Sequence, residues 1–355
     1  MKVAINIIPL HSAHKSRGIG YYTRNLLMNL KRDKDLEIVE FTNISEIKNA
    51  DVIHYPWFDF FFHTLSIKNR VPTIVTIHDT TPLIFPKYYP TGVRAKLNFF
   101  LQKISLSRCK SIISDSENSK KDIHQYLKIN ESKINVIHLA ADSIFKPLKD
   151  TALLHTKRKY KIPDNFLLYV GDANWSKNLP FLLQGFKELI DNGYKNLGLV
   201  LVGRVFLKNV ENIDHPELES LKDLNRLINQ YKLQDKVLRP GFIEDEDLVA
   251  FYNLATIYVQ PSLYEGFGLP ILQAFGCGTP VVSSDRGSLK EVGGDAAVYF
   301  NPTNLNQFKS IVSEILQSNS LQEKLSRLGF NRAAKFSWDK VIKATKIVYE
   351  NVFTK

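Results

Sequence analysis

Short β-rich runs alternate with amphipathic helical segments along the whole chain. Continuous apolar runs such as Leu-Gly-Leu-Val-Leu-Val at 197–202 are typical of strands that are buried on both faces. Alternation of such strands with helices predicts parallel sheets with right-handed crossovers, and therefore an α/β fold with doubly wound, Rossmann-like sheets. The predicted strands cover residues 2–9, 37–43, 51–56, 71–79, 111–116, 134–141, 166–172, 197–204, 237–243, 256–263, 279–285 and 296–301.

The length of the chain predicts two domains, because 355 residues exceed one ordinary hydrophobic core. We expect a first Rossmann-like domain over 1–145 and a second over 164–336, joined by a polar, proline-bearing linker at 146–163. A final helix within 337–355 could pack back on the first domain. Two sheet domains that face each other would form a cleft, which is the usual place for a ligand site.

Composition is that of a soluble globular protein, with 44% hydrophobic and 23% charged residues. No apolar run reaches the roughly 18 residues of a membrane-spanning helix, and the N-terminus predicts a first strand rather than a signal peptide. Cys109 and Cys277 lie far apart without a metal-ligand spacing. This cysteine usage favours a reducing compartment, the cytoplasm, and argues against a structural zinc.

The positive charge is concentrated in the first part of the chain. Residues 1–150 hold 22 Lys/Arg and 14 Asp/Glu, a net +8, whereas the remainder holds 25 and 22, a net +3. This balance suits an anionic partner, although a solvated lysine-rich face explains it equally well. The segment 93–110 is a basic amphipathic helix that, with the aromatic run 57–62, could rest peripherally on an acidic inner membrane face. Packing of its apolar stripe in the core is the alternative. No nucleic-acid-binding motif is found.

The segment 261–280 contains a glycine-rich turn between a buried strand and a helix. Glu265, Gly266 and Gly268 occupy the turn, and Pro270 stands in the first helical turn, where a missing N–H costs nothing. Unpaired N–H groups at the positive end of a helix suit a phosphate. Glu265 is better placed there for sugar hydroxyls. An ordinary βα turn is the alternative.

Lys177 follows the first strand of the second half and stands just before a helix predicted at 179–190. Its ammonium could join that helix N-terminus at a diphosphate, although an exposed lysine in a turn is the plain alternative. His78, with Asp79 beside it, ends the fourth strand. It could contact a bound sugar, or be a structural histidine whose tautomer Asp79 holds.

Two further patterns carry weaker signals. Gly18 and Gly20 open a helix after the first strand, but the third glycine of a dinucleotide fingerprint is replaced by Thr23. We expect close approach to a phosphate or sugar there rather than NAD binding. Asp245 and Asp247 match a metal-binding DxD pattern, yet acidic residues belong in the first turn of any helix, and we expect no metal site.

Together these motifs resemble the retaining glycosyltransferases of family 4, the group 1 class with the GT-B fold. The resemblance covers nearly the whole chain and is strongest for mannosyl- or rhamnosyltransferase-like members that build bacterial surface polysaccharides. It implies transfer of a sugar from a nucleotide-diphosphate donor to a glycan or lipid-linked acceptor, with retention and without a metal or other cofactor. The first domain would bind the acceptor and the second the donor.

The resemblance also implies roles for individual residues. Lys177 would neutralise the donor diphosphate, Glu265 would bind sugar hydroxyls, and His78 would lie beside the sugar near the reacting carbon. Phe242 would contact the base, and Gly20 would let the first domain approach the phosphates. The implied catalytic residues are His78 and Glu265. The implied donor-binding residues are Gly18, Gly20, Lys177, Arg204, Phe242, Gly266, Phe267, Gly268, Leu269 and Gln273.

Two positions depart from the family pattern. Gln273 stands where a second glutamate usually binds both ribose hydroxyls. Because a neutral amide accepts hydrogen bonds less strongly than a carboxylate, we hypothesise tolerance of deoxyribose donors. Ser176 replaces the usual basic residue before Lys177, and Arg204 could substitute for it. A sugar-nucleotide epimerase of the same fold and a non-catalytic nucleotide-sugar-binding protein remain as alternatives.

Overall fold

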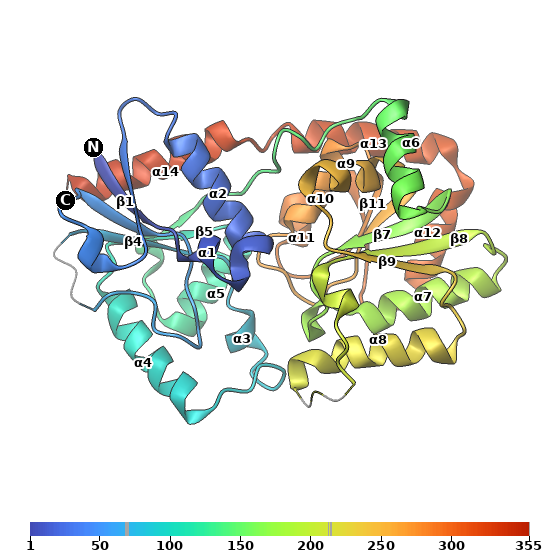
Figure 1. Cartoon of the computed structure of the whole chain (residues 1–355), viewed down its shortest axis with the longest axis horizontal. Helices are drawn as coiled ribbons and strands as arrows, with labels where there is room; N and C mark the ends of the chain where they lie inside the picture. The colour runs from blue at the N-terminus through green and yellow to red at the C-terminus, as the bar shows by residue number, and fades with distance from the viewer. Residues whose placement is uncertain (68–70, 212, 214, 355) are drawn as a thin grey trace. The chain divides into compact units, whose positions relative to one another are not determined.

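The computed structural model describes residues 1–67, 71–211, 213 and 215–354. The chain divides into two compact units, Met1–Ala140 with Phe336–Lys355, and Ala141–Lys335 (Figure 1). Each unit is built around one parallel six-stranded sheet. The predicted α/β class with two doubly wound parallel sheets is therefore confirmed.

The sheet of the first unit has the strand order β2-β1-β3-β4-β5-β6, and every neighbouring pair is parallel. This order reverses between β1 and β3, as it does in flavodoxin-like sheets. Its strands are β1 Lys2–Asn6, β2 Glu37–Phe41, β3 Val52–Tyr55, β4 Thr73–Ile77, β5 Ser111–Ser114 and β6 Ile134–Val136. All six lie within the ranges predicted from the sequence, and the central strands β3, β4 and β5 are buried along their whole length.

The sheet of the second unit has the order β12-β11-β10-β7-β8-β9, again parallel throughout. Counted from its own first strand, this is the order of dinucleotide-binding Rossmann domains, and it reverses between β7 and β10. Its strands are β7 Asn165–Val170, β8 Leu197–Val202, β9 Val237–Gly241, β10 Ile257–Gln260, β11 Val281–Ser284 and β12 Ala297–Phe300. The loops that follow β7 and β10 consequently flank the point where ligands bind in open α/β sheets.

Helices cover both faces of the sheets (Figure 1). In the second unit α7 packs against α8 and α12, and α10 packs against α9 and α13. The first unit contains α1 Ile8–His11, α2 Gly18–Leu30, α3 Thr81–Ile84, α4 Val93–Ser107, α5 Glu117–Leu127 and α14 Trp338–Phe353. The second contains α6 Asp150–Tyr160, α7 Leu179–Asp191, α8 Glu219–Gln230, α9 Asp245–Leu254, α10 Leu269–Gly276, α11 Leu289–Gly293, α12 Leu305–Gln317 and α13 Asn319–Ala333.

The two cores are formed by the apolar strands and the inner faces of these helices. In the second unit Phe181 of α7 stacks on Phe300 of β12, with ring centroids 5.6 Å apart, and Phe308 of α12 packs edge-on against both rings. All three side chains are buried. Truncating one such ring to alanine typically costs about 3–5 kcal/mol. This rigid core supports the loops at the carboxyl ends of the strands.

The segment 146–163, expected as a linker, contains the helix α6 and belongs to the second compact unit. Thr156, Lys159 and Tyr160 of α6 all donate hydrogen bonds to the carboxylate of Asp247 in α9. The helix has few buried positions, so its sequence carries little apolar periodicity. Asp247, part of the DxD pattern, is thereby occupied in joining two helices.

The final helix, α14, belongs to the first unit and packs on α2 and β3. Its Tyr349 hydroxyl lies 2.7 Å from Nδ1 of the buried His54 in β3. His54 Nε2 lies 2.8 Å from the Thr76 hydroxyl in β4, and Tyr22 of α2 lies 3.2 Å from the same hydroxyl. This polar chain connects α14, both strands and α2 inside the first unit.

Candidate active site

Lys177 and Glu265 meet at the switch point of the second sheet. Lys177 ends the 3-10 helix η4, Trp175–Lys177, after β7, and Glu265 lies in the loop after β10. The Lys177 ammonium donates to both carboxylate oxygens of Glu265, at 2.7 and 2.8 Å. Both side chains are largely buried. Lys177 and Glu265, two residues that the sequence analysis assigned to the donor site, lie 88 positions apart in the chain and form one ion pair.

Two neighbours that sequence reasoning did not single out fix the Glu265 carboxylate. Gln260 Nε2 and the Ser262 hydroxyl donate to its Oε1 at 2.8 and 2.7 Å. Tyr258 in turn donates its hydroxyl to Gln260 Oε1. Three donors on one carboxylate hold it in a single orientation. Polar side chains at alternate positions 258, 260 and 262, along β10 and just beyond its end, are the signal that could have identified them.

The glycine loop after Glu265 has a shape that larger residues would disturb. Gly268 has φ 96°, a left-handed conformation, and a Cβ there would lie 2.7 Å from Leu289. Gly287, at φ 57°, would place a Cβ 2.5 Å from the Glu265 carbonyl oxygen. The Ser288 hydroxyl donates to the carbonyl oxygens of Glu265 and Phe267. The segment after β11 thus packs against the glycine loop and fixes its backbone through hydrogen bonds.

The helix α10 begins at Leu269, directly after this loop, with Pro270 in its first turn. The first N–H groups of a helix have no acceptor within the helix and carry the positive end of its dipole. Gly266, Phe267 and Gly268 form the stretch that joins Glu265 to this end. The predicted glycine loop followed directly by a helix N-terminus is therefore present in the structure.

Arg204 and Phe242 lie together on the neighbouring strand ends. Arg204 opens the 3-10 helix η5, Arg204–Leu207, after β8, and its guanidinium lies 5.2 Å from the centre of the Phe242 ring after β9. Phe242 is 41% exposed, which leaves much of its ring accessible. A cation over an aromatic face is a favourable pair. Ser176, which stands where the family usually has a basic residue, is buried and donates to Asn174 Oδ1. It therefore places no positive charge beside Lys177.

Gln273 lies on α10 and is buried. Its side-chain oxygen accepts a hydrogen bond from the Tyr252 hydroxyl at 2.9 Å. The Gln273 side-chain oxygen, which stands where the family usually has a glutamate oxygen, is therefore already hydrogen-bonded to Tyr252. This contact was not expected from the sequence, because Tyr252 lies on α9, 21 positions earlier.

His78 of the first unit lies between two acceptors. Its Nδ1 is 2.7 Å from Asp115 Oδ2, and its Nε2 is 3.1 Å from the Pro56 carbonyl oxygen. Asp79, the neighbour expected to hold the tautomer, instead accepts from the Thr81 N–H at the start of α3. The assignment of that role to Asp79 is wrong. Strands β4 and β5 are adjacent, which brings Asp115 to the ring.

Opposing effects determine the pKa of His78. Burial lowers it, but the charge of Asp115, the hydrogen bonds at both ring nitrogens and the charge of Asp79 outweigh burial, and the pKa is raised. The Tyr22 ring packs edge-on against the imidazole, with centroids 4.9 Å apart. His78 is thus held in one orientation by contacts on several sides.

The glycine pair of the first unit begins α2 rather than forming a separate loop. A Cβ at Gly20 would lie 2.4 Å from the His14 carbonyl oxygen and 2.6 Å from that of Lys15, both in the 3-10 helix η1, Ala13–Ser16. Gly20 is therefore required for packing of η1 on α2. A Cβ at Gly18 would meet nothing within 4 Å.

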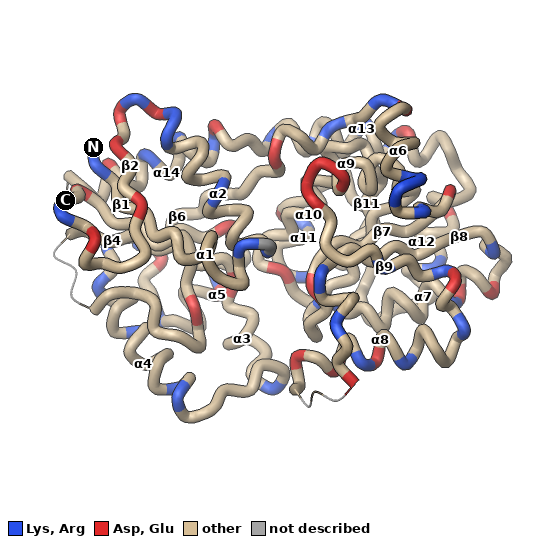
Figure 2. The backbone as a smooth tube through the Cα atoms, in the orientation of Figure 1, with Lys and Arg blue, Asp and Glu red and all other residues tan. Residues whose placement is uncertain are grey.

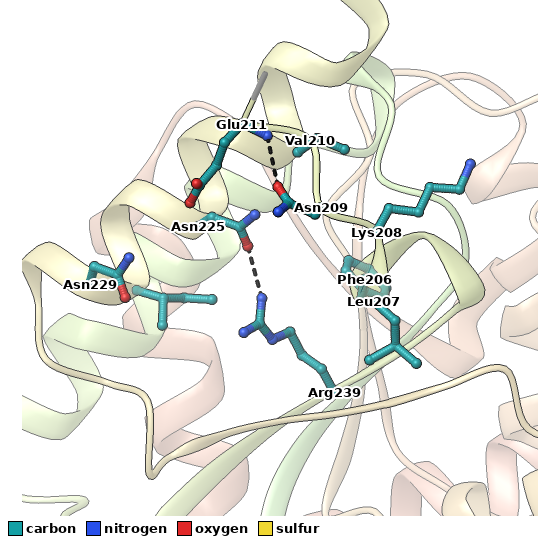
Figure 3. A pocket seen from close by; sticks show the side chains of 10 residues that line it. Phe206, Leu207, Lys208, Asn209, Val210, Glu211, Asn225, Asn229 and Arg239 are labelled. Atoms are coloured by element: carbon teal, nitrogen blue, oxygen red, sulfur yellow. Dashed lines mark hydrogen bonds between the residues drawn. The ribbon is translucent and has the colours of Figure 1, made fainter. Parts of the chain in front are cut away.

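A separate pocket of about 470 Å³ lies in the second unit (Figure 3). Arg239 of β9 donates to Asn225 of α8 across it, at 2.8 Å. None of the site residues predicted from the sequence lines it, although η5 connects its wall to Arg204. Its lining residues are Phe206, Leu207, Lys208, Asn209, Val210, Glu211, Asn225, Ile228, Asn229 and Arg239. Within the described ranges, no group of three or more His, Cys, Asp or Glu side chains could hold a metal ion.

The fold and this site define a two-unit α/β protein of the GT-B type. In agreement, the structure of Anabaena HepE in complex with UDP and glucose aligns with a TM-score of 0.75 at 14% identity, covering 98% of both chains. Residues 154–332 match the model of the glycosyl transferases group 1, and residues 14–143 match that of glycosyltransferase family 4. The chain belongs to the group 1 glycosyltransferases of family 4.

Curated relatives include mannosyltransferases. The Escherichia coli O-antigen chain mannosyltransferase B is 30% identical over 279 residues, covering 78% of this chain and 70% of that protein. The E. coli serotype-specific mannosyltransferase WbdA is 29% identical over 283 residues, again covering 78% of this chain. The chain spans only about a third of the length of WbdA, 33%. Over the described residues, every helix is too short or too polar to cross a membrane.

Proposed function

We propose that this glycosyltransferase moves a sugar of the mannose or rhamnose type from a nucleoside-diphosphate donor to a glycan or lipid-linked acceptor. Surface-polysaccharide synthesis is the process that the O-antigen relative supports. The anomeric configuration would be retained, and neither a metal nor another cofactor would take part. The observation that carries the proposal is the Lys177–Glu265 pair beside the N-terminus of α10, at the switch point of the second sheet.

In this reaction the bond between the anomeric carbon and a diphosphate oxygen breaks, and an acceptor hydroxyl oxygen forms the new bond. The diphosphate leaves with the bonding electron pair, and the hydroxyl proton passes to the leaving phosphate. Negative charge therefore develops on the diphosphate. Lys177 and the N–H groups of Phe267, Gly268 and Leu269 would stabilise this charge without reorganisation, which is the most effective form of electrostatic catalysis.

The remaining residues receive roles that follow from their positions. Glu265, held by Gln260 and Ser262, would accept hydrogen bonds from sugar hydroxyls once Lys177 turns to the phosphates. Phe242 and Arg204 would contact the base and its phosphate. Gln273 would contact the ribose, and His78 would be the contribution of the first unit to catalysis.

A panel of nucleotide sugars tests the proposal. A donor that binds only the folded state raises its stability, by about 2.7 kcal/mol at a concentration 100 times the Kd. We expect GDP-, UDP- or dTDP-linked mannose or rhamnose to raise the melting temperature and to be consumed only when an acceptor is added. Conversion of the donor without any acceptor would favour an epimerase instead. Strict dependence of transfer on a divalent cation would contradict the metal-free mechanism.

We also propose that α4 rests on an anionic lipid surface. Its side chains Val93, Leu97 and Phe100 are 85%, 59% and 57% exposed, and Phe62 of the adjoining loop is 65% exposed. The segment 86–110 contains no acidic residue (Figure 2). Its basic residues are Lys87, Arg94, Lys96, Lys103, Arg108 and Lys110. Exposed apolar side chains among basic ones suit the boundary between acyl chains and acidic headgroups.

Vesicle sedimentation tests this surface. The full chain should bind vesicles with anionic phospholipid more tightly than neutral vesicles, and added salt should weaken binding. A Leu97→Ser/Phe100→Ser variant should bind several-fold more weakly, whereas Leu154→Ser, an exposed leucine of α6, should bind as the wild type does. Equal binding of both variants, or no preference for anionic lipid, would exclude α4 as the contact.

A further inference from the structure

We propose that Asp115 is the positioning residue of His78, and that Asp115 and the Pro56 carbonyl together hold the imidazole as a doubly protonated, positively charged ring. The inference deepens the proposed function, because it states the charge and orientation of the histidine that the first unit would bring to catalysis. It concerns a residue that no motif of the family resemblance included.

The contacts at the two ring nitrogens carry the argument. The Pro56 carbonyl oxygen can only accept, so Nε2 at 3.1 Å carries a proton. Nδ1 lies 2.7 Å from Asp115 Oδ2, the length of a hydrogen bond between charged partners. If the carboxylate is ionised, Nδ1 must donate as well, and the ring carries a positive charge.

Burial raises the pKa of Asp115, and the charge and hydrogen bond of His78 oppose that shift, so His78 is the group that favours the ionised carboxylate. The Asp115 side chain is only 3% exposed, and its Oδ1 is buried without a hydrogen-bond partner in the part of the chain that the structure describes. A buried carboxylate that loses its counter-charge is strongly destabilising, so the pair depends on His78. Among the described residues, the hydrogen bond of the Asp115 side chain is thus made through Oδ2 to one ring nitrogen of His78.

Other charged and titratable groups around His78 act in both directions. Asp79 adds negative charge and favours the protonated ring. His14 and His54 interact repulsively with it when they are charged, but burial lowers the pKa of both, and that of His54 falls to about 3. His54 therefore stays neutral near pH 7. Tyr22 packs edge-on against the ring, and burial raises the pKa of its phenol, so it adds no charge.

A doubly protonated ring with both N–H groups engaged cannot accept a proton. His78 would therefore act as a fixed positive charge and not as a general base, in keeping with a reaction in which the leaving phosphate takes the acceptor proton. Charge on such a ring is present below its raised pKa and is lost as the pH rises through it.

Nitrogen-15 NMR of the histidine side chains in the ligand-free full chain tests the inference. A His78→Gln variant assigns the His78 signals. We expect both His78 nitrogens to be protonated at pH 7, and the midpoint to fall by one unit or more in Asp115→Asn. An Asp79→Asn variant serves as the control and should shift it less. A neutral ring in the wild type, an unprotonated Nδ1, or an unchanged midpoint in Asp115→Asn would overturn it.

The outcome does not require a known donor, so it is separable from failure of the proposed function. If Asp115→Asn does not fold, the wild-type spectrum alone still decides the protonation state. With a working donor, kcat should decline as the pH rises through the His78 midpoint, and Asp115→Asn should move that decline to lower pH while KM for the donor changes little. An unmoved pH profile would contradict the positioning role.

Discussion

The two units each place a basic side chain and a carboxylate after neighbouring strands, but the two pairs differ in their surroundings. Glu265 of the second unit accepts from Lys177, Gln260 and Ser262. Asp115 of the first unit is bonded to His78, and its second oxygen is buried without a partner among the described residues. The Asp115 carboxylate of the first unit thus depends on one titrating ring, whereas the Glu265 carboxylate of the second unit is held by several donors.

The difference has a chemical consequence. An ammonium ordinarily titrates near pH 10, so a lysine supplies a positive charge throughout the neutral range, whereas a histidine charge is sensitive to small changes around it. We infer that the second unit provides the strength of donor binding and the first unit provides the pH dependence. The following substitutions test this division, in order of expected effect.

Lys177→Gln should produce the largest loss. It removes the cation that would stabilise the leaving diphosphate, and losing one preorganised donor of this kind typically costs about 100- to 1,000-fold in rate. We expect kcat/KM to fall by this order, and stabilisation by nucleoside diphosphate to weaken. Lys187→Gln on α7, whose partner Asp191 is four residues away, is the matched control and should be close to wild type. Comparable losses in both variants would contradict a specific role for Lys177.

Glu265→Gln should separate binding from transfer. The neutral amide no longer holds Lys177 as an ion pair, so the ammonium is released for the diphosphate. We expect kcat to fall by roughly 100-fold because sugar hydroxyls lose a charged acceptor, while nucleoside diphosphate binds as tightly as before or more tightly. Isothermal titration with the diphosphate and turnover with the full donor measure the two effects. Weaker diphosphate binding would mean that the ion pair supports the phosphate site instead of competing with it.

The pH dependence of stability should come from the first unit. The pKa of His78 is raised in the folded state, so the stabilisation from its protonated form is fully present below the ordinary histidine pKa and is lost as pH rises through the raised value. Urea unfolding of His78→Gln should therefore lack this part of the decline as the pH rises above the ordinary histidine pKa of about 6.5. The same slope in wild type and variant would assign the dependence to another group.

Gln273→Glu should have the smallest effect. A carboxylate can accept from both ribose hydroxyls, while the native amide oxygen is already bonded to Tyr252. We expect the ratio of kcat/KM for ribose over deoxyribose donors to rise by several-fold up to about tenfold, or 1.4 kcal/mol. Gln317→Glu on α12 is an exposed control for the added charge. A wild-type protein that already prefers ribose donors about a hundredfold would contradict the hypothesis of relaxed discrimination.

Much of the fold was predictable because its signals are local. Every strand range and the helix Trp338–Phe353 follow from apolar periodicity. The glycine loop with Glu265, and Lys177 before α7, were recognisable because both lie directly after buried strands. The helix α6 was missed because its exposed, charged sequence resembles a linker.

The sequence by itself determined the two parallel sheets, the glycine turn before α10, and the positions of Lys177 after β7 and Glu265 after β10. Tertiary structure decided the partners: Asp115 for His78 in place of Asp79, Gln260 and Ser262 for Glu265, and Tyr252 for Gln273. Strand order brings distant segments together, and no local pattern encodes which side chains then lie within hydrogen-bond distance. Hydrophobic periodicity indicates the burial of a single segment, whereas a hydrogen bond between two side chains depends on how two segments pack together.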